Sequence, residues 1–319
     1  MQYHHLGQCG TRVSQLSLGG WTTFGGSVKE HKLIKTILHA AFDAGVNFYD
    51  IADIYAKGES ERAMGKVLRD FPRHELVISS KVYFPMSEDV NDRGLSRKHI
   101  MESIDKSLAR IGTDYLDIYF CHRPDPHTPI EETVRAMDDL VHQGKILYWG
   151  ASEWTGAQLE CAHGIADKRN LYAPQVEQPQ YSLLARYKFE KDLLPVVRSR
   201  GMGTVIWSPL ASGVLTGKYD SGIPEDSRLA RMDWLRDRLY QEDILSPVRQ
   251  MKTIADELGC SRAQLALAWA LAQEGVSSVI MGATKLEQLQ ENLGALAVNL
   301  SEEIRARLNT LFPPKPVSI

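Results

Sequence analysis

The sequence predicts an α/β protein built as a (β/α)8 barrel, and three features indicate that fold. Short apolar runs alternate with amphipathic, helix-like stretches through most of the 319 residues. The apolar runs seldom alternate strictly with polar residues, which is typical of parallel strands covered on both faces. No Gly-x-Gly-x-x-Gly motif follows the first expected strand, Val13–Leu18, although a doubly wound sheet would usually place one there. We therefore expect a single TIM barrel domain over residues 1–319.

The expected elements follow one another in the order that a barrel requires. In the first expected helix, apolar residues recur close to a 3.6-residue period, at Leu33, Ile37, Ala40, Ala41 and Ala44. The expected strands are Val13–Leu18, Val46–Asp50, Glu75–Lys81, Tyr115–Cys121, Ile146–Ala151, Pro174–Gln178, Thr204–Trp207 and Val276–Met281. The expected helices are Glu30–Ala44, Glu59–Arg69, Arg97–Arg110, Ile130–His142, Gly156–Lys168, Tyr187–Arg200 and Glu302–Leu311.

Two segments lie outside this alternation. Tyr3–Gly7 and Thr11–Val13 flank the turn sequence Gln8-Cys9-Gly10, which predicts an N-terminal hairpin that caps the barrel bottom. After the seventh expected strand, Ser208–Ser246 is long, irregular and interrupted by glycine and proline. Long ordered loops often carry function. We therefore expect long loops on the C-terminal face of the barrel.

Composition and charge argue against several classes of protein. The net charge of −3 provides no basic field to attract nucleic acid or an anionic membrane. No apolar run approaches the roughly 20 residues that span a bilayer, and the N-terminal residues lack the apolar core of a signal peptide. We expect a cytoplasmic protein without membrane insertion. No zinc-protease, P-loop or hydrolase motif is present, and no metal site is expected. The four cysteines are expected to be buried free thiols.

Four ionisable residues are expected to meet at the mouth of the barrel. Asp50, Lys81 and His122 stand at the ends of three consecutive expected strands, and Tyr55 lies in the loop after Asp50. Side chains at the C-terminal ends of barrel strands face the active-site mouth. Each residue alone has an ordinary role as a helix cap, a packed ring or a solvated charge. Their combination on neighbouring strands points to catalysis.

These residue types fit the delivery of a proton during carbonyl reduction. Hydride addition to a carbonyl carbon leaves negative charge on the oxygen, and a tyrosine with a pKa of about 10 can supply the proton. We expect Lys81 to lower the pKa of Tyr55 and Asp50 to orient Lys81. His122 is expected to hydrogen-bond the substrate oxygen or tune the donor. A Schiff-base aldolase would also use a barrel lysine, and Lys81 alone does not exclude that reaction.

Longer motifs around these residues resemble a known family. The segment Phe48-Tyr-Asp-Ile-Ala-Asp-Ile-Tyr55, with Lys81 and His122, resembles the aldo-keto reductase superfamily. Within that superfamily the chain is most similar to the branch of voltage-gated potassium channel β subunits and their bacterial relatives. The supporting stretches are Gly94-Leu-Ser-Arg-Lys-His-Ile100, Arg123-Pro-Asp-Pro126, Glu131-Glu-Thr-Val-Arg-Ala-Met137, Trp207-Ser-Pro-Leu210, Gly217-Lys-Tyr-Asp-Ser-Gly-Ile-Pro224 and Gly275-Val-Ser-Ser-Val279. The resemblance implies an NADPH-dependent enzyme that reduces aldehydes or ketones to alcohols.

The resemblance also implies the residues that bind NADPH or NADP⁺. Ser152 and Gln178 correspond to residues that hydrogen-bond the nicotinamide carboxamide, and Trp207 to the ring that stacks on the nicotinamide. The other implied cofactor residues are Gly20 and Trp21, then Ser208, Pro209, Leu210, Ser212, Gly213, Lys218 and Arg228 along the diphosphate, and Gly282, Thr284, Gln288, Glu291 and Asn292 at the adenosine end. Without the resemblance, core packing for Trp207 and a helix cap for Thr284 are open alternatives.

The substrate and partners are less well defined by the sequence. Four aromatic residues are candidates for an apolar wall that suits aromatic or small hydrophobic aldehydes, with ordinary packing as the alternative: Trp21, Tyr83, Phe84 and Trp154. His122 stands where channel β subunits carry Asn, and Glu153 where they carry Arg. The alternative to an enzyme is an NADPH-binding regulatory β subunit of a membrane channel with slow turnover. Relatives in this branch form fourfold rings, so the resemblance is compatible with a homo-oligomeric tetramer or octamer.

Overall fold

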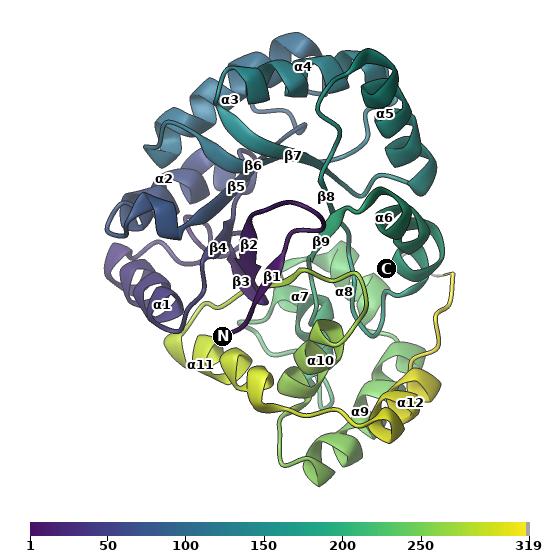
Figure 1. Cartoon of the computed structure of the whole chain (residues 1–319). Coiled ribbons are helices and arrows are strands. Elements are labelled where there is room, and N and C mark those ends of the chain that lie inside the picture. The colour runs from purple at the N-terminus through teal and green to yellow at the C-terminus, as the bar shows by residue number, and fades with distance from the viewer. Residues whose placement is uncertain (317–319) are drawn as a thin grey trace.

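The computed structural model describes residues 1–316 and contains a closed barrel of eight parallel strands (Figure 1). The barrel strands, in order around the ring, are β3 (Leu16–Gly19), β4 (Phe48–Asp50), β5 (Val77–Val82), β6 (Leu116–Cys121), β7 (Ile146–Ser152), β8 (Val176–Gln178), β9 (Gly203–Ile206) and β10 (Ser278–Met281). Pairing of Val279 with Leu16 closes the ring between the last strand and the first. The expected (β/α)8 architecture is confirmed.

Burial on both faces explains why the strands have few strict polar alternations. Every residue of the barrel strands is buried except in β7, where Leu147 is exposed. One face of each strand points into the barrel and the other lies under the surrounding helices. The helices around the ring are α1 (His31–Asp43), α2 (Glu59–Leu68), α3 (Arg97–Ile111), α4 (Ile130–His142), α5 (Gly156–Arg169), α6 (Leu194–Arg200), α10 (Arg262–Leu271) and α11 (Leu286–Leu293).

The helix boundaries follow local capping chemistry. Thr155 and Gln158 form a reciprocal capping box at the start of α5, and Ser261 and Gln264 form another at the start of α10. Each box satisfies backbone N–H groups that a helix N-terminus leaves free. The expected helix at Tyr187–Arg200 is a short π-helix, η3 (Phe189–Leu193), that runs into α6.

The N-terminal hairpin closes the bottom of the barrel, as expected, and Figure 1 shows it crossing the centre of the ring. It consists of β1 (Tyr3–His5) paired antiparallel with β2 (Arg12–Ser14). Leu6 and Val13, both fully buried, pack with Phe48, Val77 and Val176, which begin three barrel strands. The bottom of the barrel is therefore sealed by apolar contacts.

The hairpin turn requires glycine at position 7. Gly7 has a φ of +59°, and a Cβ there would lie 2.4 Å from the carbonyl oxygen of Gly201. The neighbouring amide of Gln8 donates to the same oxygen at 2.9 Å. This close approach joins the hairpin to the loop before β9, and only a residue without a side chain fits it.

Two expectations about the chain path are wrong. The expected first strand, Val13–Leu18, is divided between hairpin strand β2 and barrel strand β3. At the break, the Asn47 side chain accepts from the Ser14 amide at 2.7 Å. The expected irregular segment Ser208–Ser246 contains the 3-10 helix η4 (Ala211–Thr216), α7 (Arg228–Arg231), α8 (Asp233–Leu239) and the start of α9 (Glu242–Glu257). The C-terminal helix α12 (Glu302–Leu311) lies beside α9.

The cysteines fit the expectation only in part. All four are free thiols, and Cys9 and Cys121 are buried, but Cys161 is exposed and Cys260 is partly exposed. Cys161 lies on α5, the surface helix after β7. None of the helices within residues 1–316 is long and apolar enough to cross a bilayer.

Candidate active site

The structure brings Asp50, Tyr55, Lys81 and His122 together at the C-terminal end of the barrel. Asp50 ends β4, Lys81 lies near the end of β5, and His122 directly follows β6. Tyr55 begins the 3-10 turn η1 (Tyr55–Gly58). Because these strands are adjacent and parallel, their ends meet in one sector of the barrel mouth.

Lys81 is the centre of this cluster. Its Nζ donates to Asp50 Oδ2 at 2.7 Å, to the Ile51 carbonyl oxygen at 2.7 Å and to the Tyr55 hydroxyl at 3.1 Å. The Lys81 side chain is fully buried, and that of Asp50 is 4% exposed. All three ammonium protons therefore have acceptors, which fixes the ammonium beside the phenol.

Two further side chains donate hydrogen bonds to the other carboxylate oxygen of Asp50, Oδ1. Ser79 Oγ donates to Asp50 Oδ1 at 2.7 Å, and Gln178 Nε2 donates to the same atom at 2.9 Å. Ser152 Oγ in turn donates to the Gln178 carbonyl oxygen at 2.9 Å. The sequence placed Gln178 only with the cofactor and gave Ser79 no role. Their contacts with Asp50 were missed because they depend on the barrel register.

Burial governs the pKa of each titratable group around the phenol. Burial raises the pKa of Tyr55 well above its ordinary value, and the Asp50 carboxylate acts in the same direction while Arg123 opposes it. Burial also lowers the pKa of Lys81, although Asp50 opposes that change. The net pKa of Tyr55 is therefore raised, because burial and the Asp50 carboxylate outweigh the expected lowering by the Lys81 ammonium. Asp50 compensates the charge of Lys81, and enclosure of the phenol disfavours its anion.

His122 faces Tyr55 as a neutral imidazole. Burial lowers the pKa of His122 well below its ordinary value, and the charges of Lys81 and Arg123 lower it further. Its ring centre lies 5.7 Å from that of Tyr55 and 4.9 Å from that of Phe84. Nδ1 of His122 is buried and has no hydrogen-bond partner in residues 1–316. The described protein groups therefore leave one ring nitrogen of His122 without a hydrogen bond.

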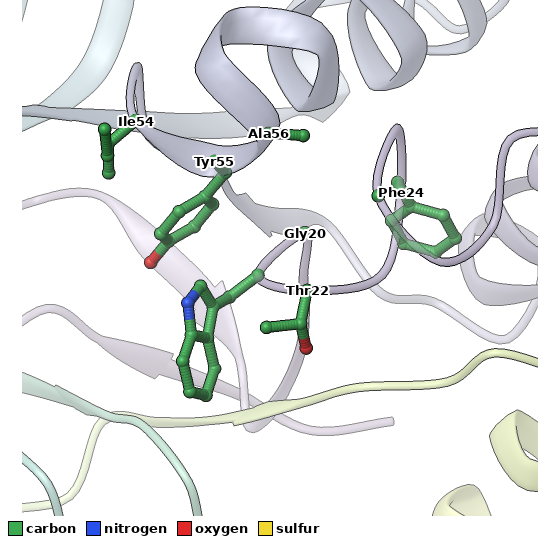
Figure 2. Close-up of a pocket in the computed structure, with 8 residues that line it drawn as sticks. Gly20, Thr22, Phe24, Ile54, Tyr55 and Ala56 are labelled. Carbon is green, nitrogen blue, oxygen red and sulfur yellow. The ribbon is translucent and has the colours of Figure 1, made fainter. Parts of the chain in front are cut away.

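Tyr55 borders a pocket of about 280 Å³ at the mouth. Figure 2 shows its hydroxyl projecting away from the η1 turn, with Gly20 and Thr22 on a neighbouring segment. The backbone that presents Tyr55 is strained, because Ala56 and Lys57 have φ values of 50° and 52°. The lining residues are Gly20, Trp21, Thr22, Phe24, Gly26, Ile54, Tyr55 and Ala56.

Trp207 is held in place by a residue that the sequence singled out only as a departure. Glu153 has a φ of +62°, and its Oε1 accepts from Trp207 Nε1 at 3.0 Å and from the Gln180 amide at 2.6 Å. Lys188 Nζ donates to Glu153 Oε2 at 2.8 Å. Trp21 meets Trp207 edge-on with ring centres 6.3 Å apart. Trp207 was expected as the ring that stacks on the nicotinamide, but its contact with Trp21 and the contacts of Glu153 with Lys188 and Gln180 were missed.

The segment implied to bind the diphosphate forms a tight turn after β9. Ser208, Ala211 and Ser212 all have positive φ, as does Gly213. Pro209 and Leu210 complete this turn, and the exposed Lys218 follows it. Arg228, farther along, donates from Nη2 to Thr22 Oγ1 at 2.9 Å and lies 4.9 Å from the Trp21 ring. The segment after β9 therefore contacts the loop after β3 across the barrel mouth.

The residues implied at the adenosine end lie in the loop after β10, at Gly282 and Thr284, and within α11, at Gln288, Glu291 and Asn292. Gln288 Oε1 accepts from the Thr284 amide at 2.8 Å and from Thr284 Oγ1 at 2.9 Å. Asn292 is buried, and its side-chain amide donates to the Gly282 carbonyl oxygen at 3.3 Å. Glu291 is exposed.

The expected substrate wall is present in part. Tyr83 and Phe84 meet edge-on with ring centres 5.2 Å apart, and Phe84 contacts His122. Trp21 lines the pocket at Tyr55. Trp154 is 1% exposed and packs in the hydrophobic core. Its assignment to the substrate wall is therefore wrong, because the chain after β7 turns its ring inward.

Arg123 is a further residue at this site that the sequence left unassigned. Its Nη1 donates to the His122 carbonyl oxygen at 2.5 Å and to Ser152 Oγ at 3.3 Å. Its guanidinium carbon lies 5.7 Å from the Phe84 ring centre and 5.9 Å from that of Trp207. The signal in the sequence was its position directly after a strand-end histidine.

Comparison with known proteins agrees with this arrangement. The aldo/keto reductase family model matches residues 15–311. A probable voltage-gated potassium channel subunit beta from Oryza sativa subsp. japonica is 47% identical, over 99% of this chain and 98% of that protein. One from Arabidopsis thaliana is 49% identical, over 93% and 92%. A putative one from Schizosaccharomyces pombe is 44% identical, over 99% and 95%.

These matches confirm the resemblance to aldo-keto reductases and to potassium channel β subunits that the sequence motifs indicated. They extend over nearly the whole chain and include the segments that supply all four clustered side chains. The chain therefore belongs to the aldo/keto reductase family.

Proposed function

We propose that this protein is an NADPH-dependent carbonyl reductase in which Tyr55 delivers the proton. The observation that carries the proposal is the contact of the Tyr55 hydroxyl with Lys81 Nζ at 3.1 Å, with Asp50 holding the ammonium from its other side. A phenol whose pKa is not lowered below its ordinary value of about 10 is protonated at neutral pH, so Tyr55 holds the proton that the reaction requires. It is therefore ready to act as an acid.

Each side chain has a distinct part in the reaction. The carbonyl oxygen of the substrate lies between the Tyr55 hydroxyl and the His122 imidazole and accepts hydrogen bonds from both. As negative charge develops on that oxygen, the Tyr55 proton moves to it, and the Lys81 ammonium stabilises the phenolate left behind. Asp50 keeps the ammonium oriented. A proton from solvent then restores the phenol, and the alcohol departs.

The arrangement of residues at the mouth fits a nicotinamide dinucleotide. Bound NADPH supplies the hydride that adds to the carbonyl carbon. Trp207, anchored by Glu153, offers a fixed ring face for the nicotinamide, and the positive-φ turn at Ser208–Gly213 directs backbone groups toward a diphosphate. Lys218 and Arg228 supply positive charge for the phosphate oxygens.

A second candidate function rests on the names of the relatives. Proteins 44–49% identical to this chain are named as potassium channel β subunits. A regulatory subunit of that kind would bind NADPH and turn over slowly. His122 favours the enzyme over this alternative, because the resemblance implies Asn at this position in channel β subunits.

Cofactor binding and turnover measured on one preparation separate the two functions. Quenching of tryptophan fluorescence reports the affinities for NADPH and NADH, and NADPH absorbance reports turnover with methylglyoxal, 4-nitrobenzaldehyde and glyceraldehyde. We expect preferred binding of NADPH and a turnover of about 1 per second or more with at least one aldehyde. The variant His122→Asn is expected to lose roughly 10- to 100-fold in turnover while binding NADPH normally. Tight binding without NADPH oxidation by the unaltered protein favours the regulatory subunit.

A further inference from the structure

Within residues 1–316, Arg123 is a cation at the active site without an anionic partner. It forms no ion pair with a carboxylate of residues 1–316, whereas the neighbouring lysines Lys81 and Lys188 are paired with Asp50 and Glu153. His122 is neutral, as its lowered pKa indicates. Of Lys81, Lys188 and Arg123, Arg123 is therefore the one cation without a carboxylate partner within residues 1–316.

The free donors of this guanidinium are available to a ligand. Both hydrogen bonds of Arg123 come from Nη1, and within residues 1–316 neither Nε nor Nη2 has a partner. Rings of Phe84 and Trp207 lie near the guanidinium, and such aromatic neighbours favour a planar cation. Two unused N–H edges match the two oxygens of a carboxylate or phosphate.

The position of Arg123 connects it with the substrate more than with the dinucleotide phosphates. Its contacts are His122, Ser152, Phe84 and Trp207, which surround the carbonyl and nicotinamide positions. The basic residue Arg228 lies elsewhere, against Thr22 and Trp21. A nicotinamide becomes positively charged when it gives up hydride, so a second cation beside it is unfavourable unless an anion lies nearby.

We propose that Arg123 binds an anionic group of the substrate, so that the site prefers carbonyl compounds with a carboxylate or phosphate close to the reacting carbon. This inference rests on the proposed reductase function and narrows its substrate class. The carbonyl oxygen meets Tyr55 and His122, while the anionic group forms paired hydrogen bonds with Nε and Nη2 of Arg123. The chemistry of hydride and proton transfer is unchanged.

Matched pairs of substrates test this preference. We would measure kcat/KM for 4-formylbenzoate against its methyl ester and for glyceraldehyde 3-phosphate against glyceraldehyde. The proteins are the unaltered chain, Arg123→Met, Arg123→Lys and the surface control Arg135→Met. Arg123 also affects the pKa of Tyr55, so its replacement changes the rate with both members of a pair. The ratio of anionic to neutral substrate isolates recognition of the anion.

We expect the unaltered protein to prefer the anionic member of at least one pair. The preference should fall by roughly 10- to 100-fold in Arg123→Met, fall less in Arg123→Lys and persist in Arg135→Met. If Arg123→Met loses the preference for 4-formylbenzoate over its methyl ester, Arg123 recognises a carboxylate. If it loses the preference for glyceraldehyde 3-phosphate over glyceraldehyde, Arg123 recognises a phosphate. Absence of any preference in the unaltered protein, or an equal preference in Arg123→Met, overturns the inference even if neutral aldehydes are reduced well.

A binding measurement separates this inference from the reductase proposal. In the presence of NADP⁺, calorimetric titration with benzoate, and with benzamide as the uncharged match, reports the anion site without turnover. We expect benzoate to bind the unaltered protein and to bind Arg123→Met at least about tenfold more weakly. If no carbonyl compound is reduced, the reductase proposal fails. This titration then still shows whether Arg123 binds an anion. Absent or unchanged benzoate binding overturns the anion site.

Discussion

The two ends of the barrel are built from opposite chemistry. At the N-terminal end, Leu6 and Val13 of the hairpin region are fully buried against apolar residues that begin the strands. At the C-terminal end, Lys81 and Asp50 are just as buried, but they are charged. Burial of apolar groups stabilises the fold, whereas burial of ions costs free energy that their mutual attraction does not always recover.

The pKa values reveal the cost at the C-terminal end. Burial opposes the charged form of Tyr55, Lys81 and His122, raising the first pKa and lowering the other two. A core selected only for stability would place apolar side chains there. The N-terminal end therefore holds the barrel together, and the C-terminal end retains costly groups for chemistry.

Breaking the buried ion pair is expected to give the largest effect. Lys81→Met removes the ammonium that contacts Asp50 and Tyr55, so we expect turnover to fall by roughly 10²- to 10⁴-fold. The remaining buried carboxylate is expected to lower the free energy of unfolding by about 3–5 kcal/mol. Aldehyde-dependent NADPH oxidation and urea unfolding measure the two effects.

The double variant Asp50→Asn with Lys81→Met separates the effect of the ion pair on stability from its effect on turnover. It removes both charges, so much of the lost free energy of unfolding should return while turnover stays low. Recovery of turnover together with stability would mean that the pair acts only on the fold.

The apolar end should show the reverse pattern. Leu6→Ala opens a cavity beneath the barrel, and we expect the free energy of unfolding to fall by about 2–5 kcal/mol. Leu147→Ala is the matched control, because Leu147 is 46% exposed and its replacement should change stability by no more than about 0.5 kcal/mol. Urea unfolding and NADPH oxidation are measured on both. A loss of turnover at temperatures where Leu6→Ala is fully folded contradicts the separation of roles.

A smaller effect is expected from pH. The folded state disfavours protonation of His122, whose pKa is lowered, while the unfolded chain takes up a proton below the ordinary value of 6.5. The contribution of His122 to stability is therefore present above that value and is lost as pH falls. Between about pH 7.5 and 5.5 the unaltered protein should lose roughly 1 kcal/mol more than His122→Asn. His99 and His163 also have lowered pKa values, but they titrate in both proteins. The prediction is contradicted if the free energy of unfolding falls by the same amount in the unaltered protein and in His122→Asn over this pH range.

Local sequence patterns predicted the barrel and the meeting of the four side chains because those features depend on strand ends. A run such as Tyr115–Cys121 shows where a strand stops, and parallel strands carry their C-terminal residues to one edge. Features that depend on distant contacts were not predictable. The break at Ser14 involves Asn47 from the next strand segment, and Trp154 turns into the core.

The electrostatics were the least predictable part. Lys81 beside Tyr55 suggested a lowered phenol pKa, but the degree of burial, which decides the direction, emerges only from the assembled mouth. Glu153 pairs with Lys188, whereas Arg123 has no such partner among the described residues 1–316, and both facts likewise depend on which loops meet.

The most direct test of the central claim is a single-turnover measurement with Tyr55→Phe. The variant loses one oxygen atom and keeps the ring, so NADPH affinity should remain close to that of the unaltered protein. Rapid mixing of the NADPH complex with 4-nitrobenzaldehyde should show NADPH oxidation slowed by roughly 10²- to 10⁴-fold. Oxidation at the rate of the unaltered protein would show that the proton comes from another group and would contradict the role of the Tyr55 cluster.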